Sequence, residues 1–147
     1  MEREQLKPTC KELSYDDIKK VISHRFPFLL VDKILKVEEN QIVGMKNVSG
    51  TDPYLQGHFP EKAVYPGVLL IESCAQVGGI LVGKLIKGTG YLARVVDFKF
   101  TEVIVPGDSI IITARYHSKL QKFIQVDCDA EVDGKLVGKG KIVYSFM

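Results

Sequence analysis

The sequence is poor in cysteine and contains no pattern that is typical of a metal site. Its three cysteines, Cys10, Cys74 and Cys128, lie far apart, without a Cys-x-x-Cys pair or a Cys/His cluster at zinc-binding spacing. An odd number of isolated cysteines does not suggest a disulfide framework either. The sequence therefore predicts a reduced protein that holds no metal and needs no cofactor.

The chain also lacks an excess of charge of either sign. Its 20 Lys and Arg nearly balance its 18 Asp and Glu, and the basic residues are spread along the sequence. Nucleic-acid-binding domains usually show a concentrated basic stripe, so this class is not supported. Residues 1–11 are polar and lack the apolar core of a signal peptide. We expect a cytoplasmic protein with neither a nucleic-acid nor a membrane partner.

No internal repeat, low-complexity tract or linker suggests a domain boundary. A chain of 147 residues, 46% of them hydrophobic, is long enough to bury the core of one domain without a disulfide or a metal. We predict a single domain over residues 1–147, in which residues 1–13 form a loose N-terminal arm.

One apolar segment dominates the sequence. Within residues 63–83 the only formal charge is Glu72. Pro66 can occupy the first turn of a helix, and residues 68–85 contain no further proline. A helix that is apolar nearly all round is buried in protein or in a membrane. Because Glu72, Gln76 and three glycines interrupt the run, we favour a core helix surrounded by strands over a membrane span of ~20 apolar residues.

The rest of the chain reads mainly as strands. Ser14 followed by Asp17 predicts a capped helix that ends near Ser23. Alternation of apolar and polar residues predicts strands over 29–35, 41–48, 96–101, 109–117, 124–132 and 136–146. Antiparallel strands with one very apolar helix indicate an α+β domain whose sheet curls around that helix.

Glu72 is the residue in this helix that needs an explanation. An ionised carboxylate among Val, Leu, Ile and small residues is unfavourable unless it is paired or protonated. A helix that only filled a core would have an apolar residue there. His58, which precedes the helix, is the candidate partner.

Four short motifs at a defined spacing resemble the signature of the β-hydroxyacyl-acyl carrier protein dehydratases of fatty-acid synthesis: His58-Phe59-Pro60, Pro66-Gly67-Val68-Leu69, Glu72 and Ala75-Gln76. Segments 24–32 and 105–108 and the closing hairpin also resemble that family. The resemblance covers residues 17–144.

The resemblance implies a hot-dog fold, a curled antiparallel sheet wrapped around one long central helix. It also implies a homodimer, often as a trimer of dimers, in which His58 of one subunit works with Glu72 of the other. The implied partner is an acyl carrier protein that bears the β-hydroxyacyl chain.

The chemistry of dehydration suits these residues. His58 can transfer a proton near neutral pH and would take the α-proton. Glu72 could supply the proton to the leaving hydroxyl. The backbone N–H of Gly67, at the helix N-terminus, would stabilise negative charge on the thioester oxygen. Gln76 lies four residues after Glu72 on the same helix face and can orient its carboxyl.

Three aromatic residues are candidates for an acyl tunnel. Phe59 follows His58, and Tyr65 precedes Pro66-Gly67. Tyr91 matches a position that closes the tunnel in some relatives, and a packed aromatic is the alternative for it. The ring of Tyr65 can face either a dimer contact or the tunnel mouth, and we predict the mouth.

Other chemically interesting residues are interpreted as structural. We expect His24 to be structural, with Phe26 and Phe28 as packing residues. Cys74 is interpreted as core, because no second histidine in the nearby sequence would activate it. Cys128 is on an inward position of its strand and is also interpreted as core.

Two alternatives remain beside the dehydratase. An acyl-thioester hydrolase on the same fold would activate water for attack on the carbonyl. A non-catalytic acyl-binding module would explain the apolar helix but not Glu72. Ala63, Tyr65, Ser73-Cys74 and Thr101-Glu102 depart from the family pattern, which leaves open the acyl chain length, the carrier contacts and a housekeeping or specialised pathway.

Overall fold

The computed structural model describes residues 11–86 and 88–146. Along these residues the elements follow one another in this order: helix α1 (Tyr15–Val21), strands β1 (Lys33–Val37) and β2 (Gln41–Asn47), the 3₁₀ helix η1 (Pro53–Leu55), helix α2 (Gly67–Val82), and strands β3 (Gly90–Phe100), β4 (Ser109–Leu120), β5 (Phe123–Val132) and β6 (Lys135–Phe146).

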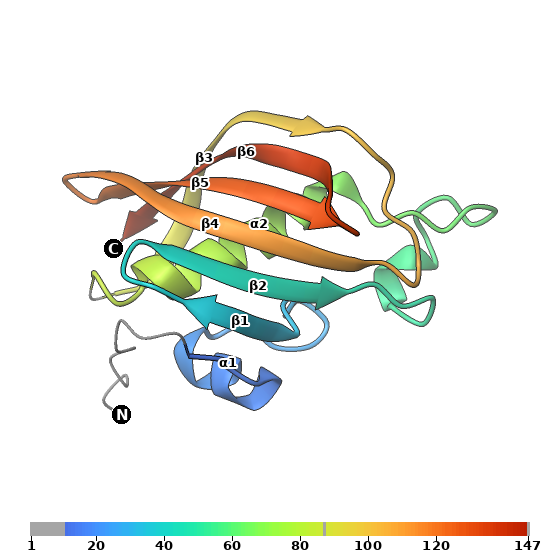
Figure 1. The fold of residues 1–147 in the computed structure, drawn as a ribbon, viewed down its shortest axis with the longest axis horizontal. Coiled ribbons are helices and arrows are strands. Elements are labelled where there is room, and N and C mark those ends of the chain that lie inside the picture. Colours follow the sequence, from blue (N-terminus) through green and yellow to red (C-terminus); the bar gives the residue numbers. More distant parts are fainter. Residues whose placement is uncertain (1–10, 87, 147) are drawn as a thin grey trace.

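The six strands form one antiparallel sheet in the order β1-β2-β4-β5-β6-β3. Helix α2 packs against one face of this sheet, chiefly on β4, β2 and β5 (Figure 1). Strands β1 and β3 are the two edges, and β3 has the more exposed side chains. The predicted α+β architecture, with a sheet around one long apolar helix, is confirmed.

The core lies between α2 and the inward faces of the strands. Buried residues of α2 such as Cys74 and Val77 meet the alternating inward residues of β4 and β5, and Cys128 is among them as expected. Gly78 lies directly under the hydroxyl of Tyr144, and a Cβ there would collide with that oxygen. Glycine at this position therefore lets α2 approach β6 closely.

The first strand begins later than predicted. The sequence favoured residues 29–35, but β1 spans Lys33–Val37, although Leu29 and Leu30 are buried. The reason is that the backbone N–H of Leu30 donates to the side-chain oxygen of Gln76 instead of to a neighbouring strand. A side chain of α2 thus replaces a strand partner.

The two helices begin as predicted, but α2 is shorter than expected. Ser14 and Asp17 form the reciprocal hydrogen bonds of a capping box at the start of α1. Helix α2 ends at Val82 with Gly83 as its C-cap, before the glycines at 88 and 90 that the sequence suggested. Gly90 instead begins β3, where it pairs with Phe146.

The predicted loose arm does not extend to residue 13. Leu13 is buried and forms an antiparallel bridge with Ile34, so it belongs to the folded core. Residues 1–10, including Cys10, lie outside the described residues, and the assignment of 1–147 to one domain stays a prediction. None of the helices in residues 11–86 and 88–146 has the length and hydropathy needed to cross a bilayer.

Candidate active site

Glu72 lies in the second turn of α2, with 20% of its side chain exposed. Its Oε1 atom is 3.2 Å from Nε2 of Gln76 and 3.5 Å from Nε2 of His24. The carboxyl is therefore half-buried and has two polar neighbours from its own chain. This pairing resolves the unfavourable burial that the sequence indicated.

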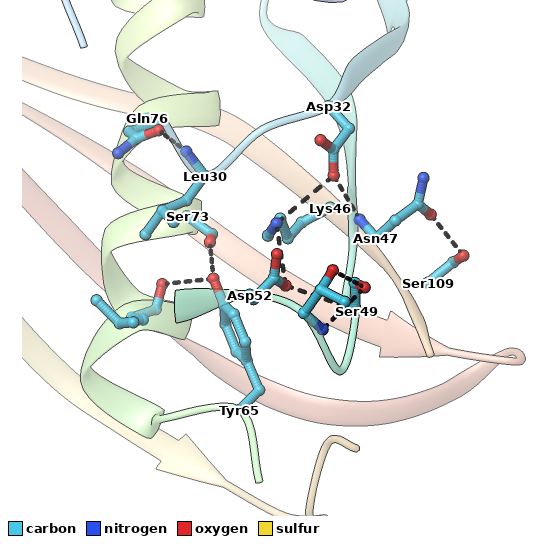
Figure 2. A network of polar contacts seen from close by, with 12 residues as sticks. Leu30, Asp32, Lys46, Asn47, Ser49, Asp52, Tyr65, Ser73, Gln76 and Ser109 are labelled. Atoms are coloured by element: carbon cyan, nitrogen blue, oxygen red, sulfur yellow. Dashed lines mark hydrogen bonds and ion pairs between the residues drawn. The ribbon is translucent and has the colours of Figure 1, made fainter. Parts of the chain in front are cut away.

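Gln76 is almost fully buried, and its side-chain amide is fixed by hydrogen bonds to the backbone of residues 28–30. Its Oε1 accepts from the N–H of Leu30 at 2.8 Å, and its Nε2 donates to the carbonyl of Phe28 at 2.7 Å. Figure 2 shows the bond from the Leu30 N–H to this amide. Because the oxygen must face the N–H of Leu30, the NH₂ group faces Glu72. The contact expected between Gln76 and Glu72 is thus present.

Glu72, His24 and Gln76 line a cavity of about 160 Å³ between the end of α1, α2 and the edge formed by β3 and β6. Apolar and small side chains make up most of the remaining wall, including Leu92 and Phe146. The cavity combines an acid with apolar surface. That combination suits an acyl thioester whose reacting carbons lie beside an acid.

His58 does not pair with Glu72 in the same chain. It lies in the turn after η1, half-buried, and its ring contacts that of Phe59 with centroids 4.3 Å apart. No hydrogen bond or ion pair among residues 11–86 and 88–146 joins His58 to Glu72, and His58 is not among the residues that line the Glu72 cavity. Phe59 has a positive φ of 56° and is 60% exposed.

Gly67 is the first residue of α2. The N-cap residue, Pro66, provides no side-chain acceptor, so the N-terminal amides of this helix are not capped by a side chain. The ring of Phe100 packs on Gly67, and a Cβ there would lie 3.0 Å from Cε1 of Phe100. Gly67 lines a second cavity of about 470 Å³, separate from the one at Glu72.

Tyr65 lies in the core and not at an exposed mouth. Its ring is 3% exposed and packs edge-on against Tyr54 with centroids 5.6 Å apart. Its hydroxyl is 2.8 Å from that of Ser73 (Figure 2). Burial raises the pKa of Tyr65, which keeps the hydroxyl protonated. Tyr91, on the edge strand β3, is 52% exposed.

The sequence-based interpretation missed the neighbour of Glu72 in its own chain, His24. A separation of 48 positions between them leaves no local spacing signal, although His24 lies in a segment that resembles the dehydratases. The packing role expected for Phe26 is wrong, because this side chain is 78% exposed. Phe28 is also exposed, and its ring stacks on that of His24 with centroids 6.4 Å apart.

Both described cysteines are buried, as expected. A hydrogen bond with Cys128, together with burial, raises the pKa of Cys74 well above its usual range. Cys74 therefore stays a thiol and is not an activated nucleophile. In the described part of the chain, no group of three or more His, Cys, Asp or Glu side chains is placed to hold a metal ion.

Sequence comparison identifies the family of this chain. A family model described as a FabA-like domain matches residues 22–141. The 3-hydroxyacyl-[acyl-carrier-protein] dehydratase FabZ of Thermotoga maritima is 39% identical over 131 residues, which cover 89% of this chain and 96% of that protein. This chain belongs to the FabZ dehydratase family. FabZ of Streptococcus sanguinis is likewise 39% identical over 140 residues, covering 90% of this chain and 97% of that protein. The predicted family and its hydro-lyase class are confirmed.

Solved structures confirm the hot-dog fold. The dehydratase heterocomplex ApeI:P from Xenorhabdus doucetiae matches with a TM-score of 0.77 and 18% identity, over 88% of this chain and 90% of that one. A hypothetical thioesterase with coenzyme A from Streptococcus pneumoniae matches with a TM-score of 0.63 and 17% identity, over 78% and 84%. At this identity the likeness concerns the fold alone.

Proposed function

We propose that this protein removes water from (3R)-hydroxyacyl-acyl carrier protein thioesters and forms trans-2-enoyl thioesters, in fatty-acid or related acyl or polyketide biosynthesis. Membership of the FabZ family over most of the chain supports the reaction. The observation that carries the assignment of the site is Glu72, an acid held by Gln76 on an otherwise apolar helix and facing a cavity.

The reaction is a β-elimination with two proton transfers. The imidazole of His58 takes the α-proton, and the electron pair of that C–H bond forms the new double bond as the C–O bond breaks. Glu72 gives its proton to the leaving hydroxyl, which departs as water. Because Gly67 and Glu72 of one chain line separate cavities, the N–H that donates to the thioester oxygen, where negative charge develops, would be that of Gly67 in the subunit that supplies His58.

His58 and Glu72 act from two subunits in this proposal. The lack of a contact between them within one chain supports a shared site. Strand β3 is an edge whose exposed side chains include Tyr91, Leu92 and Val95. An apolar edge strand with unpaired backbone groups is suited to pairing with a second copy. We therefore propose a homodimer, and a trimer of dimers as the larger assembly that the family resemblance suggests.

The acyl chain would run along α2 toward residues that the second subunit helps to enclose. Phe59 and Tyr91 are exposed in the single chain, so they are the better candidates for the tunnel wall. Tyr65 contributes from the core, where it lines the cavity beside Gly67. The substrate carrier would be an acyl carrier protein, and the proposed location is the cytoplasm.

A single assay separates the candidate functions. The protein is incubated with β-hydroxybutyryl and crotonyl thioesters, while the absorbance of the conjugated enoyl thioester and the release of free thiol are recorded together. A dehydratase interconverts the two substrates without releasing thiol. Thiol release without enoyl change would establish a thioesterase, and an acyl-binding module would produce neither signal. Glu72→Gln, which keeps the shape of the side chain, is the matched control.

A further inference from the structure

Only one oxygen of the Glu72 carboxyl has polar neighbours among the described residues. Gln76 Nε2, at 3.2 Å, and His24 Nε2, at 3.5 Å, both approach Oε1. No hydrogen bond or ion pair within the described residues reaches the other oxygen, Oε2. The two oxygens are therefore chemically distinct before any substrate binds.

The segment that bears His24 is fixed at both ends. The guanidinium of Arg25 donates to the carbonyls of Lys19, Ile22 and His24 at 2.7–2.9 Å, which ties this segment to the end of α1. At its other end Gln76 bonds to the backbone of Phe28 and Leu30. Because Gln76 also holds Glu72, the segment from 24 to 30 and the active face of α2 form one hydrogen-bonded unit.

The surroundings of the ring decide which nitrogen bears its proton. Nδ1 of His24 is buried and has no hydrogen-bond partner among the described residues. A proton on Nδ1 would therefore be a buried donor without an acceptor, which is unfavourable. The neutral ring with its proton on Nε2 avoids this, and Nε2 is the atom that faces Glu72.

Other titratable groups do not compete for this carboxyl. Among the residues that line the cavity, the titratable side chains are His24, Glu72 and Tyr144. Tyr144 donates its hydroxyl to the carbonyl of Ala75 at 2.6 Å, and burial raises its pKa, so it stays neutral. Arg25 is engaged with backbone carbonyls.

We propose that His24 is a positioning residue for Glu72 of the same chain: with Gln76 it donates to Oε1 and thereby places the transferable proton on Oε2. An acid whose Oε1 accepts two donors carries its own proton on the other oxygen, and only that oxygen is free for the leaving hydroxyl of the substrate. This inference rests on the proposed dehydratase function. It assigns to His24 no proton transfer of its own.

Two variants of His24 separate positioning from packing. His24→Leu removes the donor and keeps bulk, and we expect kcat to fall about 10- to 100-fold with little change in KM, the usual effect of misplacing a catalytic group. His24→Gln provides an amide N–H at a similar reach and should regain most of kcat. His117→Leu, at an exposed histidine of β4, is the control and should behave like the wild type. If Gln is as poor as Leu, the donor role is overturned.

Two further measurements are the effect of His24→Leu on kcat in a Glu72→Gln background and the pH–rate profile of His24→Gln. In a Glu72→Gln background, His24→Leu should cause no further loss, because it acts through the carboxyl. If His24→Leu lowers kcat in this background as much as it does in the wild type, His24 acts independently of Glu72 and the proposal is overturned. The pH–rate profile of His24→Gln should keep both limbs of the wild-type profile. Disappearance of one limb would make His24 a proton-transfer group instead.

The contact itself is tested without any activity. The chain has only three histidines, so their ring resonances in NMR spectra can be assigned with the Leu variants. Glu72→Gln should shift the ring resonances of His24 and leave those of His117 unchanged. Unchanged His24 resonances would overturn the contact even in an active dehydratase. If the wild type fails to interconvert the thioesters while His24 responds to Glu72, the proposed function fails and the contact stands.

Discussion

Glu72 and His58 differ in how much of their environment one chain provides. Glu72 has two polar neighbours in its own chain, whereas His58 forms no hydrogen bond or ion pair with the described residues and its ring lies beside that of Phe59. The acid is thus organised before assembly. In the mechanism proposed above, the imidazole of His58 meets Glu72 and the substrate only across the interface between two subunits.

His58 and Glu72 should behave as one unit in kinetic measurements. His58→Ala removes the base and Glu72→Gln removes the acid, and each should lower kcat by roughly two to four orders of magnitude. The double variant should lose little more than the worse single variant, because groups that act together are not additive. Steady-state rates of enoyl thioester formation provide the measurement. Near-wild-type dehydration by either single variant would exclude the assigned role.

The segment between β2 and α2 owes its shape to a buried cation. Lys46, 6% exposed at the end of β2, lies 3.8 Å from a carboxylate oxygen of Asp32 and 3.7 Å from one of Asp52. Asp52 in turn accepts from the N–H of Ser49 at 2.9 Å, as Figure 2 shows. Since Asp52 directly precedes η1, these contacts fix the start of the segment that leads to His58.

Replacement of Lys46 by methionine should therefore lower the stability of the fold. It leaves two partly buried carboxylates without their cation, and we expect a loss of about 1–3 kcal/mol in the free energy of unfolding. Urea denaturation at one fixed protein concentration measures it, because dissociation of a dimer also contributes. The control is Lys135→Met, which removes an exposed pair with Glu102 and should change stability by less than about 1 kcal/mol. Equal effects of the two variants would contradict the role of Lys46.

The sheet as a whole is asymmetric at its two edges. Strand β1 is covered in part by the bridge from Leu13 and by the contacts of α1. Strand β3 is largely exposed along its length, including the apolar side chains of Leu92, Val95 and Phe100. Exposed apolar edge strands promote association between chains. This asymmetry makes β3 the edge that we expect to meet a second copy.

Mixing two inactive variants tests the shared site. In a heterodimer of His58→Ala and Glu72→Gln subunits, one of the two sites receives an intact histidine and an intact glutamate. After complete subunit exchange roughly a quarter of the wild-type activity should return, because half of the dimers are mixed and each has one good site. The control mixes His58→Ala with the double variant, which offers no intact histidine. Verified exchange without recovery would place both residues of each site in one chain.

The sequence by itself determined the features that repeat locally. The period-two alternation located β5 and β6, the capping box located α1, and the apolar run after Pro66 located α2. Glu72 stood out for the same reason, since one charge in such a run is visible without any structure. Because each residue of a helix or strand faces either the core or the solvent, the order of apolar and polar residues along the sequence shows the type of element.

Only the tertiary structure decided which distant groups meet. His24 reaches Glu72, and Leu30 gives its N–H to Gln76, across 46 to 48 positions of sequence. The same contact delayed the start of β1, and packing against Tyr54 carried Tyr65 into the core. A single directional hydrogen bond between remote segments has no periodicity and leaves no mark on the local sequence. It forms because the folded chain must satisfy each buried polar group with whatever partner lies nearest.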